Sequence, residues 1–115
     1  MAVTPIDKSL VTVLVVALVI ATIAAPLALR KVPPNAIYGY RARATMSDDA
    51  LWFDANAHFG RGMIAAALAS AAAAVVLFKL FPPDRQSATL STVLILVVPN
   101  LVATLATSRF VRRQR

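Results

Sequence analysis

Three long apolar windows constrain this chain of 115 residues more than any other feature. Leu10–Leu29 holds twenty residues without a charge, Met63–Phe81 holds nineteen with only Lys79 near its end, and Ala88–Ser108 holds twenty-one without a charge. An α-helix rises about 1.5 Å per residue, so about 20 residues cross a hydrocarbon core ~30 Å thick. The windows therefore predict three transmembrane helices and leave no room for a separate soluble domain.

Composition agrees with a membrane protein and excludes several kinds of chemistry. Hydrophobic residues make up 59% of the chain and charged residues 15%, which is more apolar than a soluble domain of this length. There is no cysteine and no Glu, and there is a single His, so thiolate chemistry is excluded and metal ligands are scarce. We expect no cofactor and no catalytic activity.

The predicted fold class is all-α: an integral membrane three-helix bundle that forms one transmembrane domain over residues 1–115. Its helices are expected at about 9–29, 48–81 and 88–110, with a loop at 30–47. The second helix would measure about 51 Å at 1.5 Å per residue, so its first turns should leave the membrane core. Because this helix is rich in alanine, which lets helix backbones approach closely, it should form the centre of the bundle.

Single residues refine the expected helix ends. Pro26 is expected to kink or end the first helix. Ser47 is a favourable N-cap for the second helix, and Asp48 and Asp49 would place negative charge at its positive end. In the third helix Asn100 follows Pro99, and its amide is a candidate for packing between helices through a hydrogen bond.

The distribution of Lys and Arg predicts the orientation in the membrane. The segment between the first two apolar windows and the C-terminal tail lie on the same side of a three-helix protein. Nine cationic residues are on that side, against three on the other: Arg30, Lys31, Arg41, Arg43, Arg61, Arg109, Arg112, Arg113 and Arg115 against Lys8, Lys79 and Arg85. Because positive loops stay in the cytoplasm, we expect an external N-terminus with the loop and the C-terminus in the cytoplasm. The net charge of +7 is thus explained by topology and anionic headgroups, and no nucleic-acid partner is expected.

The segment from Pro33 to Gly62 is the part of the chain that is not generic membrane sequence. It holds a spaced set of polar, aromatic and glycine residues: Pro34, Asn35, Gly39, Arg41, Thr45, Trp52, Asn56 and Gly60. Over this set the chain resembles the SdpI family of small bacterial membrane proteins. The resemblance covers about the first two thirds of the chain, and the eight residues are those that match the family pattern.

The same residues suggest how the loop folds. Trp52, Asn56 and Phe59 fall on one helix face, and we expect Asn35, Arg41, Trp52 and Asn56 to meet in one buried polar cluster that holds the loop against the second helix. Other interpretations stay open: Asn35 bonding its own turn, and Trp52 as an interfacial anchor. Arg41 and Arg43 could bind a ligand, lipid phosphates or the acidic helix start.

Asp54 and His58 are placed to pair at i, i+4 on another face of the helix. An isolated pair of this kind on an interfacial helix is a weak indication of a proton relay.

The resemblance implies a function in immunity or signalling, because the best-known relative protects a bacterium from its own secreted killing peptide and holds a repressor at the membrane. We therefore expect a non-enzymatic protein of the bacterial inner membrane that binds a peptide or protein partner. The alternative is an accessory or structural subunit of a larger membrane complex, or a homo-oligomer. Anionic headgroups are the expected lipid partners near Arg41, Arg43, Arg112 and Arg113.

Overall fold

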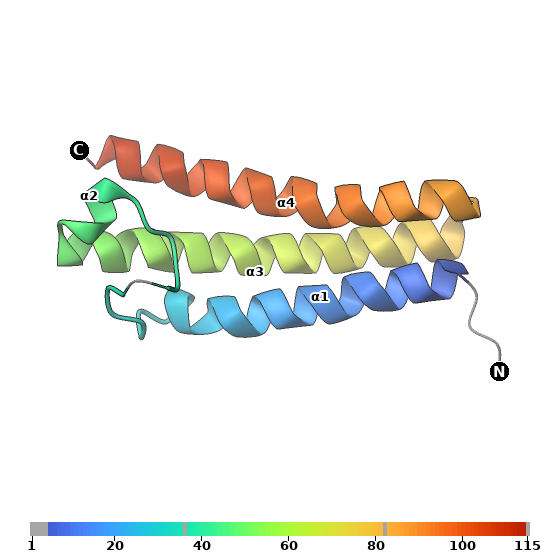
Figure 1. Cartoon of the computed structure of the whole chain (residues 1–115), viewed down its shortest axis with the longest axis horizontal. Helices are drawn as coiled ribbons and strands as arrows, with labels where there is room; N and C mark the ends of the chain where they lie inside the picture. The colour runs from blue at the N-terminus through green and yellow to red at the C-terminus, as the bar shows by residue number, and fades with distance from the viewer. Residues whose placement is uncertain (1–4, 36, 82, 115) are drawn as a thin grey trace.

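The computed structural model describes residues 5–35, 37–81 and 83–114 (Figure 1). It contains α1 (Pro5–Ala28), α2 (Arg43–Met46), α3 (Asp49–Leu80) and α4 (Arg85–Arg113). The three long helices are each apolar and long enough to cross a membrane, which confirms the all-α bundle of membrane spans. Arg115, which entered the charge count, lies outside the described residues.

α3 is the central helix, as its alanine content predicts. It packs against α1 on one side and α4 on the other, whereas α1 and α4 touch each other less (Figure 1). The helix has 32 residues, or about 48 Å at 1.5 Å per residue, and the whole bundle measures 52 × 25 × 20 Å. The loop, α2 and the C-terminus gather at one end of the bundle, which we call the motif end.

Two glycines of α3 bring the neighbouring helices close. A Cβ on Gly60 would lie 2.5 Å from the backbone nitrogen of Ala28 and 2.8 Å from the carbonyl oxygen of Ala24, both in α1. A Cβ on Gly62 would lie 3.3 Å from the Cβ of Ala103 in α4. Gly60 therefore sets the distance between the α1 and α3 backbones, while the packing at Gly62 has more room.

α1 runs through Pro26 to Ala28, so Pro26 does not end the helix. The N–H of Arg30 donates to the carbonyl of Leu27 (3.1 Å) and the N–H of Lys31 donates to that of Pro26 (2.9 Å). This is the hydrogen-bond pattern of a helix C-cap that places one residue in the left-handed region, a position usually filled by glycine. Here it is Arg30, with a φ of 61°.

The start of α3 also corrects the expected cap. The Asp48 carboxylate accepts from the N–H of Leu51 (3.2 Å), so Asp48 and not Ser47 is the N-cap. The Ser47 hydroxyl instead donates to the carbonyl of Ala44 (3.1 Å), at the end of α2. The one-turn helix α2 is itself a departure from the expected helix-free loop at 30–47.

Pro99 leaves a carbonyl of α4 free to accept a hydrogen bond from α3. A proline cannot donate to the carbonyl four residues earlier, and in α4 that carbonyl belongs to Ile95. The buried Ser70 hydroxyl of α3 donates to it at 2.8 Å. The free carbonyl is thus satisfied by the neighbouring helix, as membrane proteins require.

Asn100 makes no such interhelical bond among the described residues. Its amide nitrogen donates to the Leu96 carbonyl one turn earlier in its own helix. Its side-chain oxygen is buried without a hydrogen-bond partner among the described residues.

The two glycines provide a matched test of the packing. Gly60→Ala should destabilise the bundle by about 2 kcal/mol, because α1 must move away from the added methyl group. Gly62→Ala should be close to neutral, since mild crowding against Ala103 is offset by the better helix propensity of Ala. Helix content followed by circular dichroism during thermal unfolding in detergent measures both, and equal melting temperatures for the two variants would contradict the assignment.

Candidate functional site

Asn35 builds a turn at the tip of the loop that follows α1. Its side-chain oxygen accepts from the N–H groups of Ile37 (2.9 Å) and Tyr38 (2.6 Å). Its amide nitrogen donates to the carbonyls of Pro33 (2.9 Å) and Tyr38 (3.0 Å). Asn35 therefore bonds backbone groups of its own turn, and none of these bonds reaches α3. Pro34, which precedes it, is half-buried.

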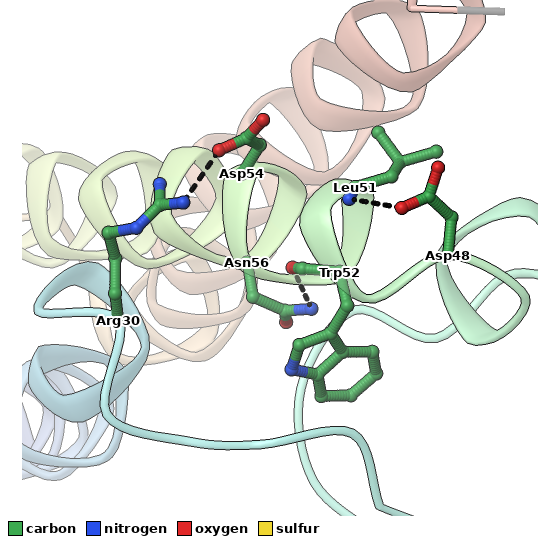
Figure 2. A network of polar contacts seen from close by, with 6 residues as sticks. All are labelled: Arg30, Asp48, Leu51, Trp52, Asp54 and Asn56. Atoms are coloured by element: carbon green, nitrogen blue, oxygen red, sulfur yellow. Dashed lines mark hydrogen bonds and ion pairs between the residues drawn. The ribbon is translucent and has the colours of Figure 1, made fainter.

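Asn56 joins this loop to α3. The side chain is 2% exposed. Its oxygen accepts from the N–H of Tyr40 (2.5 Å), and its nitrogen donates to the carbonyls of Tyr40 (3.1 Å) and Trp52 (3.0 Å). One amide thus satisfies both backbone groups of a loop residue sixteen positions away, and Figure 2 shows its bond to Trp52 on α3.

Gly39 leaves the space that this contact needs. Its φ is 109°, a conformation that residues with a side chain rarely adopt. A Cβ there would lie 2.6 Å from the Asn56 side-chain oxygen. The glycine thus allows the chain to turn directly over Asn56.

Trp52 and Thr45 complete the buried set. The Trp52 ring is fully buried, and its Nε1–H donates to the carbonyl of Val32 (2.8 Å), which ties the exit from α1 to α3. The Thr45 hydroxyl, also fully buried, accepts from the N–H of Ala42 (2.8 Å) and lies 3.0 Å from the carbonyl of the same residue. We call Asn35, Gly39, Thr45, Trp52 and Asn56, with Gly60 below them, the loop lock.

Arg41 does not join the loop lock, and Asn35 bonds only its own turn, so of the four residues expected to meet in one buried cluster only Trp52 and Asn56 bond each other. The Arg41 side chain is exposed, and no hydrogen bond or ion pair links it to another described residue. The neighbouring Tyr40 instead faces the helices: its ring packs on Phe59 with centroids 5.7 Å apart, and its hydroxyl bonds Ser108 of α4 (2.8 Å).

Asp54 and His58 do not pair with each other, contrary to expectation. Asp54 accepts a hydrogen bond from the guanidinium of Arg30 at 2.7 Å, as Figure 2 shows. His58 bonds the hydroxyl of Thr107 (2.9 Å) through Nδ1, and its ring stacks on Phe110 with centroids 4.6 Å apart. Each side chain therefore fastens α3 to a different neighbour.

Several contacts at the motif end that sequence reasoning missed join distant segments. Arg30 meets Asp54 across 24 positions, and Tyr40 meets Ser108 across 68. A serine, threonine or phenylalanine near the end of an apolar helix carries no pattern that would reveal such a partner. His58 with Thr107 and Phe110 is of the same kind.

Among the described residues, no group of three or more His, Cys, Asp or Glu is arranged to hold a metal ion. Burial raises the pKa of the Tyr38 phenol above its ordinary value of 10.0, so this group stays neutral at physiological pH. The exposed charged side chains at the motif end are mostly cationic.

Residues 31–108 match the SdpI/YfhL protein family. The chain belongs to this family. The matched region starts after α1 and reaches into the last turns of α4, so it differs from the expected first two thirds of the chain. It includes all eight motif residues and hence the whole loop lock of this SdpI/YfhL protein. No curated protein and no solved structure matches the chain.

The two kinds of motif residue should respond differently to mutation. Asn56→Ala should destabilise the protein by about 2–4 kcal/mol, because it leaves the part-buried N–H of Tyr40 without its partner and removes the shorter of the two hydrogen bonds to the Tyr40 carbonyl. Arg41→Ala should change stability by less than about 0.5 kcal/mol, since the side chain is exposed. Thermal unfolding in detergent, followed by the emission of Trp52 as the single tryptophan, tests both. Similar losses in the two variants would show that the loop lock is not what holds the loop.

Proposed function

We propose that this SdpI/YfhL protein is a non-enzymatic binding protein of the bacterial inner membrane. In this proposal the motif end faces the cytoplasm and captures an acidic segment of a peptide or protein partner. The orientation rests on the excess of Lys and Arg at that end, which the positive-inside rule assigns to the cytoplasm.

One observation carries the proposal: the polar side chains of the loop lock form hydrogen bonds within the protein, whereas two arginines beside it form no ion pair with a described residue. The side chains of Asn35, Thr45, Trp52 and Asn56 are all hydrogen-bonded within the protein. Arg41 and Arg43 are exposed on the same framework, and neither forms an ion pair with a described residue. A rigid loop that displays unpaired arginines suits a partner with carboxylates.

The charge balance supports a cationic surface over a broad part of this end. Eight Lys and Arg residues lie in the described part of residues 30–61 and 109–114, against three carboxylates. Two of these carboxylates are already engaged, because Asp48 caps α3 and Asp54 pairs with Arg30. Arginine binds carboxylates through two parallel N–H donors, which provides geometric selectivity for an acidic partner. Arg112 and Arg113, at the end of α4, are proposed to contact anionic headgroups.

A charge-reversal pair tests the acidic partner. The protein with Arg41→Glu and Arg43→Glu should lose a companion that co-purifies from native membranes, because like charges repel. The matched control with Arg112→Glu and Arg113→Glu should keep it, and retention should weaken with added salt. Mass spectrometry of the bound fraction measures the ratio of companion to protein. A companion retained equally by both double variants would contradict the assignment of the loop arginines.

A second candidate function, an accessory subunit or a homo-oligomer, is favoured by a groove between α3 and α4. The groove has a volume of about 370 Å³, and most of the residues along it are small, among them Gly62, Ala65, Ala69, Ala103 and Ala106. Small residues let another helix approach closely within a membrane.

The groove is tested by filling it. Ala69→Leu should disrupt the association with another subunit or a second copy, because the added side chain occupies the path of a packing helix. Ala73→Leu is the control, since Ala73 is also exposed on α3 but lies outside the groove. Crosslinking in native membranes measures the association, and the accessory function fails if both variants crosslink as the parent protein does.

A further inference from the structure

A second groove, between α1 and α3 at the motif end, has no role in the contacts described above. It has a volume of about 200 Å³ and an apolar lining. α1 contributes Ile20, Ile23 and Leu27, α3 contributes Phe59 and Met63, and the loop covers one end with Tyr38. We call it the Tyr38 groove.

The surroundings of the Tyr38 groove are apolar and point to lipid. Ile23, in its wall, is 50% exposed. Ile37, next to Tyr38, is 93% exposed. The Asn35 side chain donates two hydrogen bonds and accepts two within this turn, so the turn holds Ile37 in its exposed position. An apolar side chain held outward beside membrane-spanning helices is stable where it contacts acyl chains, and costly in water.

The lining of the Tyr38 groove favours an acyl chain among the possible occupants. Water is unsuited, because an apolar cavity offers it no hydrogen-bond partners. A single hydrocarbon chain is narrow and apolar, and it can enter from the bilayer along the exposed side of α1.

Polar groups at the motif end of the groove suit a phospholipid. The Tyr38 phenol is neutral, and tyrosine is favoured at the level of the headgroups. Lys31 is exposed four residues beyond Leu27, and it has no ion pair with a described residue. Its ammonium group is available to a phosphate at the end of a chain that lies in the groove.

We propose that the Tyr38 groove is a specific binding site for one phospholipid, whose acyl chain lies between α1 and α3 and whose phosphate is near Lys31. This site is independent of the acidic partner, because it is apolar and faces the bilayer. The loop lock then has a second consequence, since it holds Tyr38 over the chain.

Filling the groove tests the site. Ile23→Trp, in the protein purified in mild detergent with added phosphatidylglycerol, should reduce the lipid retained in native mass spectrometry by about one molecule per protein. Val19→Trp is the matched control, because it introduces the same side chain on α1 outside the groove and should retain lipid as the parent protein does. Equal retention by both variants, with unchanged melting temperatures, would overturn the proposal.

A second measurement does not depend on filling the groove. Tyr38→Trp places an indole in the groove wall, and titration with a brominated phospholipid in detergent should quench its emission to saturation near one lipid per protein. The parent protein serves as the control, because its only tryptophan is fully buried in the loop lock. Quenching that rises without saturation would show contact with bulk lipid and would overturn the specific site.

Discussion

The buried amide of Asn56 is the interaction on which the rest of the motif end depends. A loop that leaves a membrane helix carries backbone N–H and carbonyl groups that must find partners if the loop packs against protein. Asn56 accepts a hydrogen bond from the N–H of Tyr40 and donates one to its carbonyl, and the Trp52 indole donates to the carbonyl of Val32. Gly39 must then be a glycine, because a Cβ would occupy the position of the Asn56 oxygen.

Close backbone approach is the second physical theme of this SdpI/YfhL protein. Apolar side chains gain little from leaving lipid, so helix association relies on van der Waals contact and hydrogen bonds. Gly60 brings α1 against α3, and Ser70 uses the carbonyl that Pro99 leaves free in α4. The loop lock sits directly above the contact at Gly60. The packing of the loop therefore depends on the packing of the helices, and a substitution at Gly60 is expected to displace the loop as well.

This arrangement divides the residues of the motif end into two groups. The polar residues with short side chains and the tryptophan hold the loop, whereas Arg41 and Arg43 are exposed. The same framework places Tyr38 over an apolar groove and directs Ile37 outward. The motif thus combines residues that hold the loop with a residue, Arg41, that the loop leaves exposed. Spacing along the chain does not distinguish the two, because both are polar and both lie in one short segment.

The sequence by itself determined the membrane class, the three spans, the central place of α3 and the residues of the motif. These follow from local properties: the length of an apolar run sets a membrane crossing, and alanine content sets how closely a helix packs. Tertiary structure decided which motif residues meet. Asn35 turned back on its own loop, Arg41 turned outward, and Asp54 and His58 found partners in Arg30 and Thr107. Asp48 replaced Ser47 as the cap, and α2 formed inside the expected loop. The partners of Asp54, His58 and Tyr40 lie up to 68 residues away, and the folded path of the chain alone brings them within hydrogen-bond distance. The Asn35 turn, the Asp48 cap and α2 are local features, which the sequence pattern did not distinguish from their alternatives.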